Sequence, residues 1–394
     1  MRVSTSQIYT IANIGMRDAQ AAINKTNSQM ASGQRVLTPA DDPVAATQIM
    51  QLTQQLARLE QFNKNIDVAE NKLSLEEVAL DSITSLVQGM QELAVSAGNT
   101  ATLTPSEYKM MAAEVDSRIK ELLNLQNTKD SSGQHIFAGY QSAQPAYAEQ
   151  GGAVAYQGDD GSVSLQVSES VTIQASDPGR KIFEGISTSH NTFSAYDLTA
   201  TSEVTGFTVA DQDALDQMVP GTLKISVAGG VISVTDNNGN SVPPIPASQP
   251  NTAPIEIAGI SMSLADGDTL ALNIKPEESS IMQTLTNFRD AMLNAANVTD
   301  AELSGVIDKT LGTLNNAVTR IGEVQAEVGA RLNTLESTKN LNADSALYTQ
   351  EVLGSLQDLD YAEATTRLQM QELVLSAAQQ SFAKVSKLTL FNYL

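Results

Sequence analysis

Residues 361–394 read YAEATTRLQMQELVLSAAQQSFAKVSKLTLFNYL, and this stretch decides the fold. Large side chains recur every seven residues along it, and a second row follows three residues after each of them. This heptad spacing is typical of a helix that packs against another helix. The first row is Tyr361, Leu368, Leu375 and Phe382, and the second row is Ala364, Gln371, Ala378 and Val385. The C-terminus is therefore predicted to form one long helix, whose packing face we expect to extend to Phe391.

The N-terminus repeats this pattern. Its large row is Tyr9, Met16, Ile23 and Met30, and its second row is Ala12, Ala19, Thr26 and Gly33. Two helices that each carry a row of small residues can approach closely, so the two ends of the chain are predicted to pack against each other. A small residue in place of a core leucine forgoes roughly 2 to 5 kcal/mol, whereas ordering costs about 1 to 2 kcal/mol per residue. We therefore expect ends that are disordered in the monomer and fold when packed among copies of the chain.

A sharp turn is predicted after the first helix. Gly33 suits the left-handed position that follows a helix, and Arg35 comes two residues later. Asp42 followed by Pro43 is a typical N-cap and first helical position, because the carboxylate accepts free backbone N–H groups and proline has none to lose. Asp41 and Asp42 are adjacent carboxylates, but their place before a helix favours capping over acid–base catalysis. We predict that these residues form a turn.

The remaining sequence predicts a mainly α fold with a β-rich insertion. Heptad spacing covers residues 44–97 and resumes after residue 276, whereas residues 140–275 alternate with a period of two between turn signals. We expect long helical rods formed by both halves of the chain. The expected division is 1–42 with 350–394 as terminal helices, 43–139 with 276–349 as a rod domain, and 140–275 as an outward-facing β domain, with the terminal helix starting after Tyr348.

Composition argues against several classes of function. The chain has no cysteine and two histidines, His135 and His190, so zinc sites and histidine-based catalytic triads are not expected. The net charge of −22 disfavours nucleic acid as a partner, and no apolar run is long enough for membrane insertion. The loops at Asp211 and Asp236 lack the glycine and glutamate of a calcium loop, so plain turns are favoured. We predict no enzyme activity, no cofactor and no metal.

The termini also carry the motifs of a known family. Residues 30–36, MASGQRV, and residues 39–46, PADDPVAA, resemble the signature of the flagellin superfamily, in which one helix ends at Ser-Gly-x-Arg and the next begins after Asp-Asp. The resemblance covers roughly residues 1–140 and 276–394. Within the superfamily, the opening residues 1–5, the run 42–46 and the ending LFNYL resemble the members that join the hook to the filament.

This resemblance implies a structural subunit of the bacterial flagellum that assembles through its terminal helices. The implied partners are copies of itself, a hook-side junction protein, flagellin, an export chaperone and the type III export apparatus. An extracellular location on the flagellum is implied, reached without a cleaved signal peptide, and the polar residues 1–7 contain no apolar signal region. Two alternatives stay open at this point: a filament flagellin, and an extracellular binding module whose β domain sits on a helical stalk.

Overall fold

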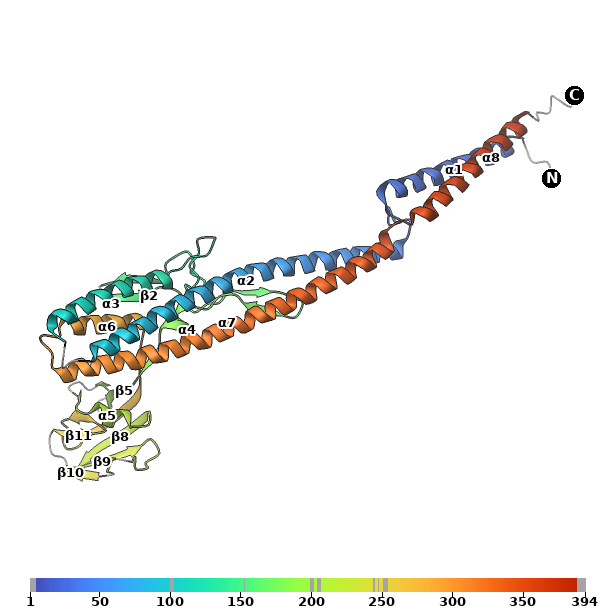
Figure 1. Ribbon diagram of the computed structural model, residues 1–394. Helices are drawn as coiled ribbons and strands as arrows, with labels where there is room; N and C mark the ends of the chain where they lie inside the picture. The colour runs from blue at the N-terminus through green and yellow to red at the C-terminus, as the bar shows by residue number, and fades with distance from the viewer. Residues whose placement is uncertain are drawn as a thin grey trace. The chain divides into compact units, whose positions relative to one another are not determined.

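The computed structural model describes residues 5–99, 103–151, 153–198, 202–203, 207–243, 245–246, 248–250 and 254–387. The chain forms two compact units. The first comprises residues 1–66, 167–170 and 336–394, and the second comprises residues 67–166 and 171–335. The helices are α1 (Thr5–Ser32), α2 (Pro43–Ala97), α3 (Pro105–Gln126), α4 (Gly179–Phe183), α5 (Gln212–Asp216), α6 (Ile281–Leu293), α7 (Asp300–Gln357) and α8 (Tyr361–Lys387) (Figure 1). The expected mainly α fold with a β-rich insertion is confirmed.

The first unit contains α1, α8, the beginning of α2 and the end of α7. The terminal helix was expected to start after Tyr348, and this prediction is wrong, because α7 continues to Gln357. The break comes at residues 358–360, where the Asp360 carboxylate accepts the backbone N–H groups of Ala362 at 2.8 Å and Glu363 at 3.1 Å. These bonds cap the start of α8, so an aspartate cap marks where this helix begins.

Two helices of the second unit begin at side-chain caps. Thr104 and Glu107 form a reciprocal capping box at α3, and Thr299 and Glu302 exchange the corresponding bonds at α7. Two heptad rows run along α7, of which one is the core row and the other is half-buried. The core row consists of Leu314, Ile321, Val328 and Leu335, all fully buried.

The strands lie between residues 147 and 279. They are β1 (Tyr147–Gln150), β2 (Ala153–Tyr156), β3 (Ser164–Gln166), β4 (Thr172–Gln174), β5 (Ile186–Asp197), β6 (Ser202–Glu203), β7 (Thr208–Val209), β8 (Gly221–Ala228), β9 (Val231–Asp236), β10 (Ser248–Pro250), β11 (Ile255–Ile257), β12 (Ile260–Met262) and β13 (Thr269–Ser279). The largest sheet is antiparallel in the order β10-β9-β8-β13-β5-β6. Its buried core runs from Ala195 to Ile274, so the β core occupies the later part of the expected insertion.

The earlier part of the insertion packs against the helices of the same unit. Tyr147 bonds through its backbone to the side chain of Asn127, just after α3. Buried aromatic rings gather around it, with the Phe137 and Phe183 centroids 5.2 Å apart and edge to face. The two compact units divide the chain at other places than the three expected domains. The three-domain division stays a prediction.

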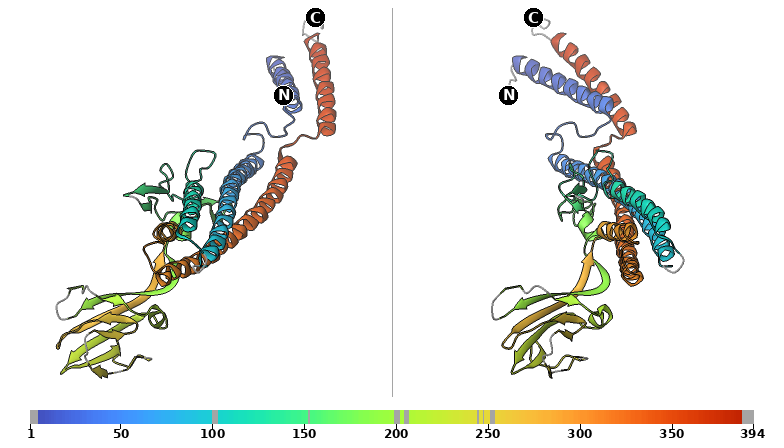
Figure 2. Two further views of the ribbon diagram at one scale, coloured as in Figure 1. Left: turned by 60° about the vertical axis from the view of Figure 1, so that its left-hand side comes forward. Right: turned by 90° about the vertical axis from the view of Figure 1, so that its left-hand side faces the viewer.

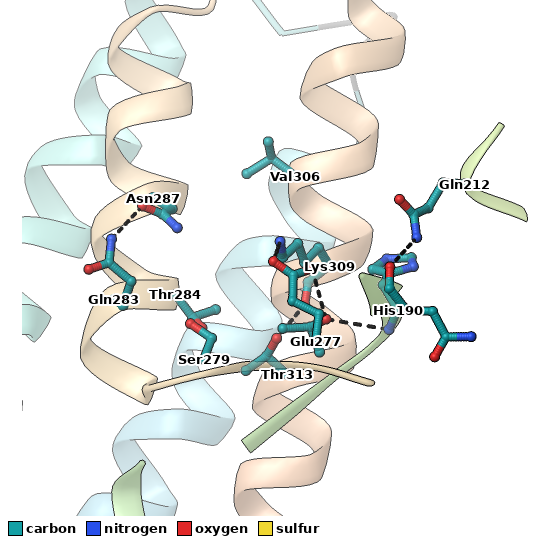
Figure 3. A network of polar contacts seen from close by, with 12 residues as sticks. His190, Gln212, Glu277, Ser279, Gln283, Thr284, Asn287, Val306, Lys309 and Thr313 are labelled. Carbon is teal, nitrogen blue, oxygen red and sulfur yellow. Dashed lines mark hydrogen bonds and ion pairs between the residues drawn. The ribbon is translucent and has the colours of Figure 1, made fainter. Parts of the chain in front are cut away.

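A two-stranded ribbon of β5 and β13 leads from the helices into the sheet (Figure 2). The pairing slips between Pro276 and Glu278, and the Glu277 side chain there forms an ion pair with Lys309 of α7 (Figure 3). Thr188 of β5 donates to the same carboxylate at 3.3 Å. The bulge therefore turns an acidic side chain out of the ladder and fixes the ribbon to α7.

Candidate assembly interface

Helices α1 and α8 lie side by side and antiparallel (Figures 1 and 2). At one end, the rings of Tyr9 and Phe382 meet edge to face with centroids 5.7 Å apart. At the other end, the Tyr361 hydroxyl donates to the Met30 carbonyl at 3.1 Å. The first large residue of one helix therefore meets the last of the other, and the predicted packing of the two ends of the chain is confirmed within one molecule.

Polar side chains connect the two helices in the half of the pair nearest the turn after α1. The Thr26 hydroxyl donates to the Gln371 side-chain oxygen at 2.9 Å. The Arg367 guanidinium donates to the Gln29 side-chain oxygen at 3.1 Å, and the Gln29 amide donates to the Arg35 carbonyl at 2.6 Å. Sequence reasoning missed Gln29 and Arg367, although each flanks a heptad position. Their hydrogen bonds specify the pairing of the two helices at little gain in hydrophobic burial.

The predicted interface residues are buried to different degrees. Ile23 is buried, whereas Tyr361 remains 53% exposed. Half-buried positions are Tyr9, Met16, Met30, Leu368, Leu375 and Phe382. The side chain of Val385 and the whole of Phe391 lie outside the described residues. Apart from Ile23, the described large residues of both rows are therefore covered only in part.

The turn after α1 docks onto the break between α7 and α8. Gly33 has φ +71°, as its predicted role requires, and its carbonyl accepts the backbone N–H of Leu359 at 2.9 Å. The Arg35 backbone N–H donates to the Gln357 carbonyl at 2.7 Å, and its guanidinium donates to the Leu356 carbonyl at 3.0 Å. Sequence reasoning predicted the turn but not its partner, because hydrogen bonds between backbones leave no pattern in side chains.

Asp41 and Asp42 act within this turn as predicted. Asp42 accepts the Ala45 backbone N–H at 3.0 Å and caps α2. Asp41 accepts the backbone N–H groups of Leu37 and Thr38 and pairs with Lys25 at 2.6 Å. The hydrogen bond from Lys25, followed by the backbone bond from Thr38, lowers the pKa of Asp41 to about 2. The backbone bond from Ala45, followed by the Arg35 guanidinium, lowers the pKa of Asp42.

Exposed apolar side chains also lie outside the heptad rows on both helices. They are Ile11 and Ile14 on α1 and a stripe of Met370, Leu373 and Val374 on α8, each between 53% and 65% exposed. Neither heptad row includes these residues, so the packing of α1 on α8 does not cover them. Exposed apolar side chains gathered on one element are typical of surfaces that pack against another protein.

Other kinds of site find little support in the described part of the chain. No group of three or more acidic, histidine or cysteine side chains is placed to hold a metal there. The Asp236 carboxylate accepts backbone N–H groups of its own turn, as predicted. The Asp211 carboxylate instead caps the short helix α5, where a plain turn was expected. Of the helices described, none is both long and apolar enough to cross a membrane.

Two family models match the regions that form this interface. The model of the bacterial flagellin N-terminal helical region matches residues 3–142, and that of the bacterial flagellin C-terminal helical region matches residues 311–394. The chain belongs to the flagellin superfamily. Together the matches include all of α1, α2, α3 and α8 and most of α7. The family regions thus coincide with the longest helices, whereas α4, α5, α6 and the β core lie between the two regions.

Individual members of the superfamily are similar over their whole length. Flagellar hook-associated protein 3 of Escherichia coli (strain K12) is 29% identical over 100% of this chain and 99% of its own. A flagellin of Clostridium tyrobutyricum is 22% identical over 96% of each chain. The crystal structure of flagellar hook associated protein-3 from Legionella pneumophila covers 78% of this chain and 98% of its own, with a TM-score of 0.56 and 24% identity. This last likeness supports the fold.

Proposed function

We propose that this chain is a structural subunit of the bacterial flagellum that joins the hook to the filament. The observation that carries the proposal is the pair α1–α8, which leaves Ile11, Ile14 and the stripe on α8 open to solvent. In the assembled state this stripe and the half-buried heptad rows pack against copies of the chain. The copies form a ring, with the hook-side junction protein on one side of it and flagellin on the other. The subunit has no catalytic role.

Membership of the superfamily and full-length similarity to hook-associated protein 3 support a junction subunit. A filament flagellin is the second candidate, favoured by the full-length but weaker match to the Clostridium protein. The two differ in how far they polymerise. Added to isolated hooks, a junction subunit forms a thin layer and stops, whereas a flagellin grows long filaments, and electron microscopy distinguishes these outcomes.

Export completes the proposal. The subunit leaves the cell unfolded through the type III export apparatus, with a chaperone holding α8 until export, and reaches the flagellum without a cleaved signal peptide. The absence of cysteine is compatible with this route, because no disulfide has to be opened before passage. Binding of a truncated chain lacking residues 361–394 to the purified chaperone tests the role of α8, and equal binding of full and truncated chains contradicts it.

The interface is tested by charged substitutions on α8. Leu368→Asp together with Leu375→Asp places two carboxylates in the half-buried row, and we expect a folded second unit but no attachment of filaments. The matched control is Gln369→Asp with Gln379→Asp, which adds the same charge at exposed positions of the same helix. Normal filaments in the Leu368/Leu375 variant contradict the proposal.

The β core offers a test against the stalked binding module. Phe193 of β5 pairs with Ile274 of β13, so residues 194–273 can be replaced by a short turn that joins adjacent strand positions. A junction subunit keeps hook attachment after this excision, because the packing surfaces of α1 and α8 are intact. If attachment is retained but binding of cells to a surface is lost, the β core carries a separate binding function.

A further inference from the structure

One acidic side chain lies inside the second unit without a charge partner. Glu76 of α2 is 2% exposed, and its Oε1 atom has no hydrogen-bond partner. The backbone amide of Asp177 contacts the same carboxyl group. A buried carboxylate with an unsatisfied oxygen is costly in free energy, so either a proton or a cation must accompany it.

The surrounding charges already balance without Glu76. Asp177, itself fully buried, pairs with Arg331 and, at 3.1 Å, with Lys181. Lys181 also pairs with Glu327 at 2.7 Å, and Arg331 pairs with Glu327 at 3.0 Å. Two cations thus face two carboxylates. Lys181 and Glu327 are 41% and 49% exposed, so the excess negative charge of an ionised Glu76 would fall on the buried part of the cluster, which holds Asp177 and Arg331.

Glu76 is one of the residues that line a cavity of about 100 Å³. Its other charged and titratable lining side chains are Lys72, Asp130, His135 and Tyr140. Lys72 is paired with Asp130 at 3.6 Å, and the His135 Nδ1 atom contacts the Asn127 carbonyl at 2.8 Å. Lys72 is therefore already neutralised, and the polar cavity is large enough for water, through which a proton can reach Glu76.

We propose that Glu76 is a proton-binding site that fastens residues 172–184 between α2 and α7, and that losing this proton loosens the fastening. The segment carries Asp177 and Lys181, which connect it to Arg331 and Glu327 of α7. A negative charge on Glu76 repels Asp177 and weakens its place in the cluster. The proton thus regulates how firmly this segment is held.

The direction of the pH effect follows from burial. Burial, followed by the charge of Asp177, raises the pKa of Glu76 to about 8. A raised pKa in the folded state means that the stabilisation is complete below the ordinary pKa of a glutamate and is lost as pH rises towards about 8. Among the described carboxyl groups, Glu184 is the other one whose pKa burial raises, so it needs its own control.

Urea unfolding of the full chain at pH values from about 5 to 8.5 tests this proposal. One linked proton makes the unfolding equilibrium constant rise up to tenfold per pH unit. We expect this rise in the natural chain and its loss in Glu76→Gln, which keeps the shape but cannot ionise. Glu77→Gln, at the exposed neighbouring position, and the separate variants His135→Gln and Glu184→Gln should retain it. An equal slope in Glu76→Gln and the natural chain overturns the proposal.

A measurement on the natural chain covers the case in which Glu76→Gln does not fold. Infrared difference spectra between pH 6 and 9 should show one protonated carboxyl group losing its proton, and amide exchange of residues 172–184, corrected for intrinsic rate, should accelerate over the same range. Absence of a protonated carboxyl band at pH 6 overturns the proposal. A band without faster exchange refutes the fastening role.

Discussion

Two glycines of α1 and its turn should respond to the same substitution in opposite ways. Gly15 lies within α1, and a Cβ added there meets no atom within 4 Å. Gly33 follows the helix with φ +71°, and a Cβ there would lie 3.3 Å from the Tyr361 hydroxyl. Alanine at position 15 should stabilise the helix by about 0.5 to 1 kcal/mol, because glycine loses more backbone freedom on folding. Alanine at position 33 should instead be destabilising.

The cost at Gly33 has two sources. A left-handed conformation costs a non-glycine residue about 1 to 2 kcal/mol. The added methyl group also crowds the Tyr361 hydroxyl, which donates to the Met30 carbonyl. Leaving the crowding aside, the two variants should differ by about 1.5 to 3 kcal/mol, which corresponds to roughly a ten- to 150-fold difference in the local opening equilibrium.

Amide exchange at Arg35 and Leu359 reports this opening directly, because both N–H groups bond across the turn. Both should exchange faster in Gly33→Ala and no faster in Gly15→Ala than in the natural chain. The double variant Gly33→Ala with Tyr361→Phe separates the two sources, since it removes the crowded hydroxyl and leaves the backbone cost. The reasoning is refuted if the two alanine variants change exchange at these amides by the same amount and in the same direction.

Three further predictions address the acid limit, the ribbon and the core. The pKa of Asp41 is lowered to about 2 in the folded state, so its carboxylate stabilises the turn fully above its ordinary pKa near 3.8, and this stabilisation is lost as pH falls towards 2. Amide exchange at Thr38 should therefore accelerate in acid in the natural chain, and Asp41→Asn should remove this acid transition. Lys309→Met should accelerate amide exchange in the β5–β13 ribbon and lower the free energy of unfolding by no more than about 1 kcal/mol, since the ion pair with Glu277 is one-third exposed. Unchanged amide exchange in the ribbon would contradict the role of this ion pair in fixing the ribbon to α7. Phe183→Ala should cost about 3 to 5 kcal/mol in urea unfolding, because its ring is fully buried, and a cost below about 1 kcal/mol would contradict the aromatic core.

The helical part of the fold was predictable because its signals are local and repeated. The rows beginning at Tyr9 and Tyr361 predicted α1, α8 and their contact, and the cap at Asp42 predicted where α2 begins. The end of α7 was placed too early because its apolar spacing fades before the break, with Asn342 and Thr349 at the next positions of the row that contains Leu335. Only the carboxylate of Asp360 marks the break, and one aspartate among many on the surface is a weak signal.

The other features depend on contacts between distant residues. Gln29 and Arg367 are ordinary polar residues in the sequence, and they become interface residues because the antiparallel register brings them together. Glu76 occupies a position in α2 that pattern reading leaves unremarked, and its burial follows from a segment a hundred residues away. Spacing along one chain predicts which face of a helix is covered, but it does not predict which polar group the covering segment brings.

The chemistry of the α1–α8 pair explains why such a pair suits assembly. Its interior relies on hydrogen bonds such as Thr26 to Gln371, which hold the register but contribute only about 0.5 to 1.5 kcal/mol each. Its apolar surface is divided, with half-buried heptad rows inside and a stripe including Leu373 outside. Larger residues in the inner row would stabilise the single chain and leave less apolar surface for a neighbouring copy to bury. Small inner residues therefore favour a pair that gains most of its hydrophobic stabilisation from neighbouring copies.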